Sequence, residues 1–118
     1  MIVILVEDSE TERALLRAQL NLANIDVIEF DNAEDALNFV SSNKAGEVVI
    51  SDAILDSKSL ASEFSHLNKL SKFRPTVCYT AAESLLTPFD FPNIPIVSKE
   101  RGASYLISAV IKSLSPAS

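Results

Sequence analysis

Short apolar runs alternate with longer segments of mixed polarity along the chain. Val and Ile dominate the first and third runs, which is typical of strands that are buried on both faces. Runs of this kind, separated by segments of helix length, predict a parallel sheet covered by helices. The five predicted strands are residues 2–6, 26–30, 47–51, 76–80 and 94–97.

The segments between the predicted strands carry helix signals. Ser9 can cap the first helix, and Glu12 three residues later completes the pattern of a capping box. Asn32 can cap the second helix. Apolar residues at helical spacing predict the third helix at residues 59–71 and the last at residues 102–114. The first helix has a broad apolar stripe made of Leu15, Leu16, Ala18, Leu22 and Ala23.

The segment between the fourth and fifth strands differs from the others. It reads AAESLLTPFDFPNIP and contains Pro88, Pro92 and Pro95. Proline lacks the amide hydrogen and clashes with the preceding helical turn. We therefore expect a shortened or irregular fourth helix, limited to one or two turns near residues 82–86.

Strands and helices that alternate in this way predict an α/β fold. With right-handed crossovers, five strands form a flavodoxin-like, doubly wound parallel sheet of order 2-1-3-4-5. This order places the first and third strands side by side, at the switch point where ligands bind outside the carboxyl ends of the strands. We expect one domain at residues 1–114, and a tail or the start of a linker at residues 115–118.

Composition narrows the classes of function. The chain has 118 residues, of which 47 % are hydrophobic, and this suits one domain with a real core. Its net charge is −6 and no cluster of Lys and Arg occurs, which argues against direct binding to nucleic acid. Only two glycines are present, whereas dinucleotide-binding loops need several close together. No apolar run is long enough to cross a membrane and no signal peptide is recognisable, so we expect a cytoplasmic protein with no membrane partner.

Two residues that often carry chemistry occur once each. Cys78 lies in an apolar stretch and is interpreted as a small buried residue in a reducing compartment. His66 lies in a polar helical stretch with no Cys or second His nearby, so we interpret it as a surface residue.

Polar residues follow four of the predicted strands at the point where each strand ends. Glu7 and Asp8 follow the first strand and Asp52 follows the third. Thr80 ends the fourth strand, and Lys99 follows the fifth. Because the carboxyl ends of parallel strands meet at one edge of a sheet, we expect these five residues to converge.

The predicted cluster is suited to phosphoryl transfer. Three neighbouring carboxylates stay ionised only if a cation neutralises them, and oxygen ligands alone suit Mg²⁺ or Mn²⁺. Lys99 adds a mobile positive charge and Thr80 adds a hydroxyl. Asp52 stands alone after the central strand, so it is the candidate nucleophile that would form an aspartyl phosphate. Taken alone, Glu7 and Asp8 could equally be acids that the dipole of the first helix favours.

From residue 2 to about residue 114, the chain resembles the response-regulator receiver domains of two-component signalling. Its acidic pair, Glu7 and Asp8, matches that of the family. Asp52 matches the phosphoacceptor, Thr80 the switch hydroxyl and Lys99 the lysine of the family.

The resemblance implies a role for each of these positions. Asp8 and Asp52 would bind Mg²⁺ directly, Glu7 would act mostly through water, and the carbonyl of Ile54 would complete the protein ligands. Lys99, Thr80 and the amide of Ala81 would hold phosphoryl oxygens. The donor would be a histidine kinase or a histidine phosphotransfer domain, and a downstream effector domain or protein would receive the signal. Such a domain assists its own phosphorylation and slow dephosphorylation, and is not an enzyme that turns over.

The chain also departs from the family pattern. The stretch DAILDSKSL lacks the Met-Pro pair and the glycine that often follow the acceptor. Glu100 stands where proline usually follows the lysine, and Ile96 stands where the family has a switching aromatic residue. These departures keep a second hypothesis open, in which the chain is a degenerate receiver and acts as a protein-interaction module without phosphorylation.

The resemblance also implies a docking surface, because partners of the family dock around the first helix. The exposed side of this helix is expected to carry Glu12, Arg13, Arg17 and Asn21. An ordinary solvated helix face is the simpler interpretation of most of these residues.

Overall fold

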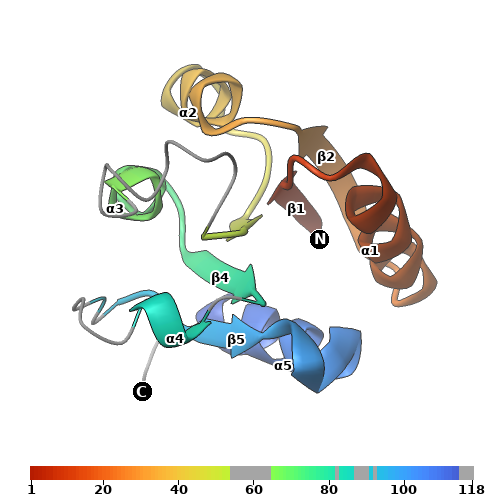
Figure 1. The fold of residues 1–118 in the computed structure, drawn as a ribbon. Helices are drawn as coiled ribbons and strands as arrows, with labels where there is room; N and C mark the ends of the chain where they lie inside the picture. The colour runs from red at the N-terminus through yellow and green to blue at the C-terminus, as the bar shows by residue number, and fades with distance from the viewer. Residues whose placement is uncertain (54–64, 82, 87–90, 92, 115–118) are drawn as a thin grey trace.

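The computed structural model of the chain describes residues 1–53, 65–81, 83–86, 91 and 93–114 (Figure 1). Five parallel strands form one sheet in the order β2-β1-β3-β4-β5, which confirms the predicted flavodoxin-like fold. The strands are β1 (Ile2–Val6), β2 (Asp26–Phe30), β3 (Val48–Ser51), β4 (Thr76–Thr80) and β5 (Ile96–Ser98). The helices are α1 (Glu10–Leu22), α2 (Ala33–Ser42), α3 (Ser65–Ser71), α4 (Glu83–Leu86) and α5 (Gly102–Leu114), with a short 3-10 helix, η2 (Lys99–Arg101), before α5.

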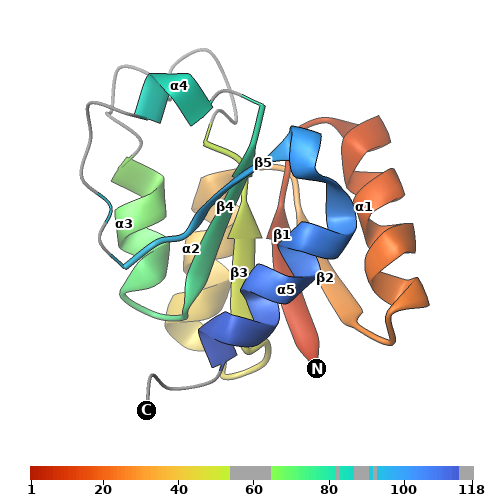
Figure 2. The same cartoon turned by 90° about the horizontal axis from the view of Figure 1, so that it is seen from below.

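The helices form a layer on each side of the sheet. Helices α1 and α5 cover one face, and α2 and α3 cover the other (Figures 1 and 2). Because both faces are covered, the middle strands are apolar at successive positions: Val3 and Leu5 pack toward α1 and α5, whereas Ile4 and Val6 pack toward α2. This two-sided burial explains why the first run shows no alternation of polar and apolar residues.

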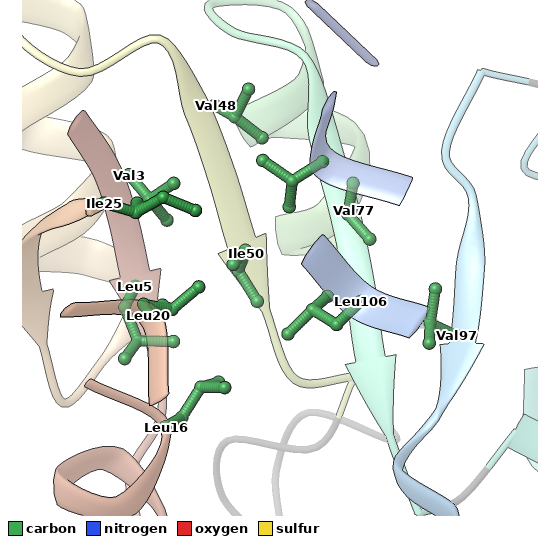
Figure 3. Close-up of a cluster of buried hydrophobic side chains, with 11 residues drawn as sticks. Val3, Leu5, Leu16, Leu20, Ile25, Val48, Ile50, Val77, Val97 and Leu106 are labelled. Atoms are coloured by element: carbon green, nitrogen blue, oxygen red, sulfur yellow. The ribbon is translucent and has the colours of Figure 1, made fainter. Parts of the chain in front are cut away.

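One cluster of buried apolar side chains lies between the sheet and the α1–α5 layer. Figure 3 shows its branched aliphatic side chains, which meet across strands β1, β3, β4 and β5. Leu16 and Leu20 from α1 and Leu106 from α5 close this cluster. Full burial of one such side chain contributes about 1.5–3 kcal/mol, so the two layers are held chiefly by this apolar contact.

Some predicted boundaries and faces are corrected by the structure. Strand β3 begins at Val48, one residue later than expected, and β5 begins at Ile96, because Ile94 instead packs beside Leu86 under α4. The stripe predicted on α1 is wrong in part: Leu16 is buried as predicted, together with Leu20, whereas Leu15 and Leu22 are 61 % and 86 % exposed. Leu16 and Leu20 are four residues apart and so lie on the same face of α1, whereas Leu15 and Leu22 lie outside this face.

The second half of the chain contains the shortest elements. Helix α4 spans four residues, as the proline-rich segment after it predicts. The predicted start of α3 at residue 59 lies outside the described residues, as does the predicted tail at 115–118. Cys78 is fully buried, as expected. Within the described ranges, no helix has the length and apolarity needed to span a membrane.

Candidate functional site

The site lies at the edge of the sheet where the strands end. All arrows of the sheet point to this edge (Figure 2). The backbone continues the ladder for one residue past two strands: the amide of Glu7 donates to the Phe30 carbonyl at 3.0 Å, and that of Asp52 donates to the Val6 carbonyl at 3.2 Å. These bonds hold Glu7 and Asp52 at the ends of adjacent strands, as the strand order requires.

Lys99 connects the acidic residues of this edge. Its Nζ lies 2.8 Å from Asp52 Oδ2, 3.2 Å from Glu7 Oε2 and 3.0 Å from Glu12 Oε1. An ammonium group carries three N–H donors, and these three carboxylates accept all of them. The structure thus brings together three of the five residues that the strand ends predict, and it adds a fourth residue, Glu12.

Burial makes this cluster electrostatically costly. Glu7 is 5 % exposed and Asp52 is 9 % exposed. Burial raises the pKa of Glu7 to about 7, even though the Ser9 amide and Lys99 both favour its charged form. Burial alone would lower the pKa of Lys99, but hydrogen bonds to Asp52 and Glu12 and the charges of Asp52 and Glu7 together raise it. Lys99 is therefore charged at every physiological pH, whereas Glu7 titrates near neutrality.

Thr80 and Asp8 occupy different surroundings. Thr80 is 1 % exposed at the last position of β4, where it pairs in register with Ser98 of β5. Asp8 follows Glu7 directly and is exposed. Ala81 follows Thr80 and is exposed, and Ile54 lies outside the described residues. The roles predicted for these residues remain predictions.

The side chains at this edge carry the type of ligand atom that a hard divalent cation prefers. Glu7 and Asp52 offer only carboxylate oxygens, the ligands that Mg²⁺ and Mn²⁺ prefer, and both already share one positive charge. Among the residues that the structure describes, no group of three His, Cys, Asp or Glu side chains is gathered closely enough to hold a metal ion. Asp8 and the main chain after Asp52 are the other candidates for ligands.

Glu12 was predicted as part of a capping box, and the structure corrects half of that prediction. The Ser9 hydroxyl accepts from the Glu12 amide at 3.3 Å, as predicted. The Ser9 amide, however, donates to Glu7 Oε1 at 3.1 Å instead of to Glu12. Because the buried carboxylate takes this donor, the Glu12 side chain extends to Lys99. No local pattern in the sequence signals this contact between residues 87 positions apart.

His66 was predicted as a surface residue, and this is wrong. It is 7 % exposed, and its Nε2 lies 3.0 Å from the carbonyl oxygen of Asp52. A carbonyl can only accept, so Nε2 carries the proton of this bond. The Ser51 hydroxyl donates to the same oxygen at 2.9 Å. Helix α3 buries His66, Leu67 and Leu70, and the polar residues around His66 in the sequence conceal that it faces the sheet.

The first helix also supports the site through Arg13. Its Nη1 donates to the Glu7 carbonyl at 2.8 Å, and its Nε lies 3.3 Å from Glu29 Oε1. Arg17 pairs with the other oxygen of Glu29 at 2.7 Å. These two arginines therefore join α1 to the end of β2, in addition to forming part of the solvated helix face.

Comparison with known proteins agrees with the observed topology. No protein-family model matches the sequence, and the search of curated proteins finds no match. Solved structures do match over nearly the whole chain. The receiver domain of the hybrid histidine kinase CckA superposes with a TM-score of 0.71 at 19 % identity, covering 98 % of this chain and 100 % of that one.

Two further structures show the same likeness. A response regulator receiver protein from Sinorhizobium medicae has a TM-score of 0.74 at 20 % identity, with 97 % of this chain and 94 % of that chain covered. The response regulator TrrA from Thermotoga maritima, in complex with Mg(2+)-BeF, has a TM-score of 0.73 at 22 % identity, with 96 % and 98 % covered. The chain has the receiver-domain fold. At these identities the likeness concerns the fold alone, so the roles of residues in this receiver fold rest on the geometry described above.

Proposed function

We propose that the chain is a phosphoacceptor receiver domain in which Asp52 takes a phosphoryl group and the protein thereby changes its interactions with other proteins. The main observation behind this proposal is that the Asp52 carboxylate is buried at the end of the central strand of a receiver fold. It lies there 2.8 Å from Lys99 Nζ. Each part alone is common, but a nucleophile, a fixed cation and a second acid at one strand edge suit phosphoryl transfer.

The proposed reaction is a transfer between a histidine and Asp52. An Asp52 oxygen forms a bond to phosphorus while the bond between phosphorus and the donor imidazole nitrogen breaks. The imidazole, protonated beforehand on its other nitrogen, leaves in the neutral form. Lys99, Thr80 and the amide of Ala81 would hold the oxygens of the transferred group, whose charge must be neutralised where it accumulates. The domain assists this step and the slow hydrolysis that follows, and is not an enzyme that turns over.

We further propose that the site holds Mg²⁺ or Mn²⁺. Asp8 and Asp52 would bind it directly, Glu7 mostly through water, and the Ile54 carbonyl would complete the protein ligands. When bound, the cation supplies positive charge beside the carboxylates and the phosphoryl oxygens. Glu7 and Asp52 both contact the ammonium group of Lys99, so their carboxylates already lie close to a common cation. The Mg(2+)-BeF complex of the structurally similar TrrA also supports this proposal.

The proposed partners follow from the same fold. A histidine kinase or histidine phosphotransfer domain would donate the phosphoryl group, and an effector domain or protein would respond. Similar receiver folds occur in a hybrid histidine kinase and in a response regulator/sensory box/GGDEF 3-domain protein, which supports a place in a larger signalling assembly.

A second candidate function is a phosphorylation-independent interaction module. Two observations favour it. Ile96 stands at the start of β5 where a switching aromatic residue is expected, and α4 spans only four residues. A receiver without these parts can still bind partners through its surface.

The deciding experiment is the intact mass of the protein after incubation with acetyl phosphate and Mg²⁺. We expect the mass of one phosphoryl group to be gained by the wild type and lost in Asp52→Asn and in EDTA. Asp26→Asn is the matched control, because it makes the same change at an exposed position where β2 begins. No gain in a folded wild-type protein would favour the interaction module.

A further inference from the structure

Lys99 has no uncommitted donor at its ammonium group. Its three N–H groups are directed to Asp52, Glu7 and Glu12 at 2.8, 3.2 and 3.0 Å. If Lys99 is to hold a phosphoryl oxygen, one of these carboxylates must give up its bond. The question is therefore which of the three hydrogen bonds from Lys99 breaks most easily.

The three carboxylates differ strongly in exposure. The side chains of Glu7 and Asp52 are 6 % and 11 % exposed, whereas that of Glu12 is 52 % exposed. An exposed ion pair is weak because water solvates both charges once they separate. The Ser9 amide additionally holds Glu7 in place at 3.1 Å. The bond from Lys99 to Glu12 is thus the one that breaks at the lowest cost.

We propose that Glu12 is a positioning residue that holds Lys99 at the mouth of the site and competes with the phosphoryl group for its third N–H. This inference rests on the proposed function, because it assumes that Lys99 binds the group transferred to Asp52. Glu12 thereby opposes occupation of the site by small phosphate-like anions. It also keeps Lys99 in place, beside Asp52, until a phosphoryl oxygen replaces the Glu12 carboxylate.

The chain offers a matched control in the same helical turn. Glu10 and Glu12 both lie in the first turn of α1, and both are exposed. Replacing either by Gln removes one negative charge near the helix N-terminus and so costs a similar helix-dipole term. Of these two residues, it is Glu12 whose carboxylate is paired with Lys99, at 3.0 Å. A difference between Glu12→Gln and Glu10→Gln therefore reports the specific contact and not the general field.

The test is the affinity for beryllofluoride, an anion that mimics a phosphoryl group, measured at saturating Mg²⁺ for the wild type and both variants. We expect Glu12→Gln to lower the dissociation constant roughly two- to fivefold, the range that an exposed ion pair spans, and Glu10→Gln to leave it unchanged. Without the anion, Glu12→Gln should melt slightly below Glu10→Gln, because the lost pair with Lys99 stabilises the free protein. A merely structural role would lower the melting temperature and leave the dissociation constant unchanged.

Three results would overturn the inference. If the two variants bind beryllofluoride equally, Glu12 acts only through its charge, and if Glu12→Gln weakens binding, Glu12 assists the anion. In both cases the proposed function stands, because the wild type binds the mimic. If the folded wild type binds no beryllofluoride and gains no phosphoryl group, the proposed function itself fails, and the role of Glu12 fails with it.

Discussion

In the part of the chain that the structure describes, each edge of the sheet has a cation that contacts three acceptors, but the two cations bind different kinds of acceptor. At the carboxyl edge, Lys99 contacts three carboxylates. At the amino edge, Arg74 donates from Nε to the Gly46 carbonyl at 2.9 Å, from Nη1 to the Phe73 carbonyl at 2.9 Å, and from Nη2 to the Asn43 carbonyl. The acceptors of Arg74 are neutral parts of the backbone, so they cannot titrate and cannot rearrange without unfolding a loop.

The contacts at the amino edge stabilise the fold, whereas those at the carboxyl edge involve side chains whose charge can change. Arg74 joins the segments that precede β3 and β4, where Gly46 passes so close to Ile4 that a Cβ would lie 2.6 Å from its Cδ1. Lys99 instead contacts the buried carboxylates of Glu7 and Asp52, whose negative charges a proton can neutralise. Contacts between ionised side chains can rearrange when one of the charges changes. Contacts to backbone carbonyls have no charge to lose on the acceptor and stay fixed.

The largest expected effect concerns the pH dependence of the carboxyl edge. The pKa of Glu7 lies at about 7 in the folded state, above its ordinary value of 4.5. Between these values the folded protein binds a proton that the unfolded chain releases, so stability is fully present at low pH and falls as pH rises through 7. We expect the free energy of unfolding in EDTA to fall by on the order of 2–3 kcal/mol between pH 5 and pH 8 because of Glu7.

Urea titrations at pH 5, 6, 7 and 8 measure this effect. Glu7→Gln is the control, since its neutral amide cannot titrate and its curve should be flatter by the same amount. Identical pH curves for the wild type and this variant would show that Glu7 does not carry the dependence.

The next effect concerns the amino edge. Arg74→Ala leaves three carbonyl groups without their charged donor, and we expect a loss of about 2 kcal/mol in the free energy of unfolding. Phosphorylation by acetyl phosphate, per folded molecule, should not change. Arg74→Lys keeps the charge but not the planar fork of donors, so it should restore only part of the stability. Loss of phosphorylation in folded Arg74→Ala would contradict the separation of the two edges.

The smallest of these effects concerns His66, which contacts a backbone carbonyl within the site, as Arg74 does at the amino edge. Its ring donates to the backbone carbonyl of Asp52. We expect His66→Ala to lower the free energy of unfolding by about 1–2 kcal/mol, since a buried carbonyl loses one donor but keeps the Ser51 hydroxyl. His66→Gln, which retains an N–H donor, should lose less. Equal stabilities of both variants in urea would argue against this bond.

Much of the fold was predictable because it depends on local patterns. The strands Ile2–Val6, Asp26–Phe30 and Thr76–Thr80 coincide with the predicted apolar runs. Ser9 and Asn32 cap their helices, because a side-chain oxygen beside the first turn is sufficient for that role. The meeting of Glu7, Asp52 and Lys99 was predictable from topology, since parallel strands end at a common edge.

Other features escaped prediction because they depend on which face an element presents. His66 lies among polar residues and is nevertheless buried against the end of β3. Leu15 and Leu22 are apolar and are nevertheless exposed, because α1 contacts the sheet only through its neighbouring face.

The sequence by itself determined the order of strands and helices, the layers of apolar residues and the strand ends at which charged residues stand. These features follow from burial and from hydrogen bonding within short segments, where neighbours in the chain are neighbours in space. Only the tertiary structure decided the partners of each charge: that Glu12 reaches Lys99, that the Ser9 amide goes to Glu7, and that His66 contacts Asp52. A charged or polar side chain takes the acceptor that packing brings within about 3 Å, and that choice depends on distances between segments far apart in the chain.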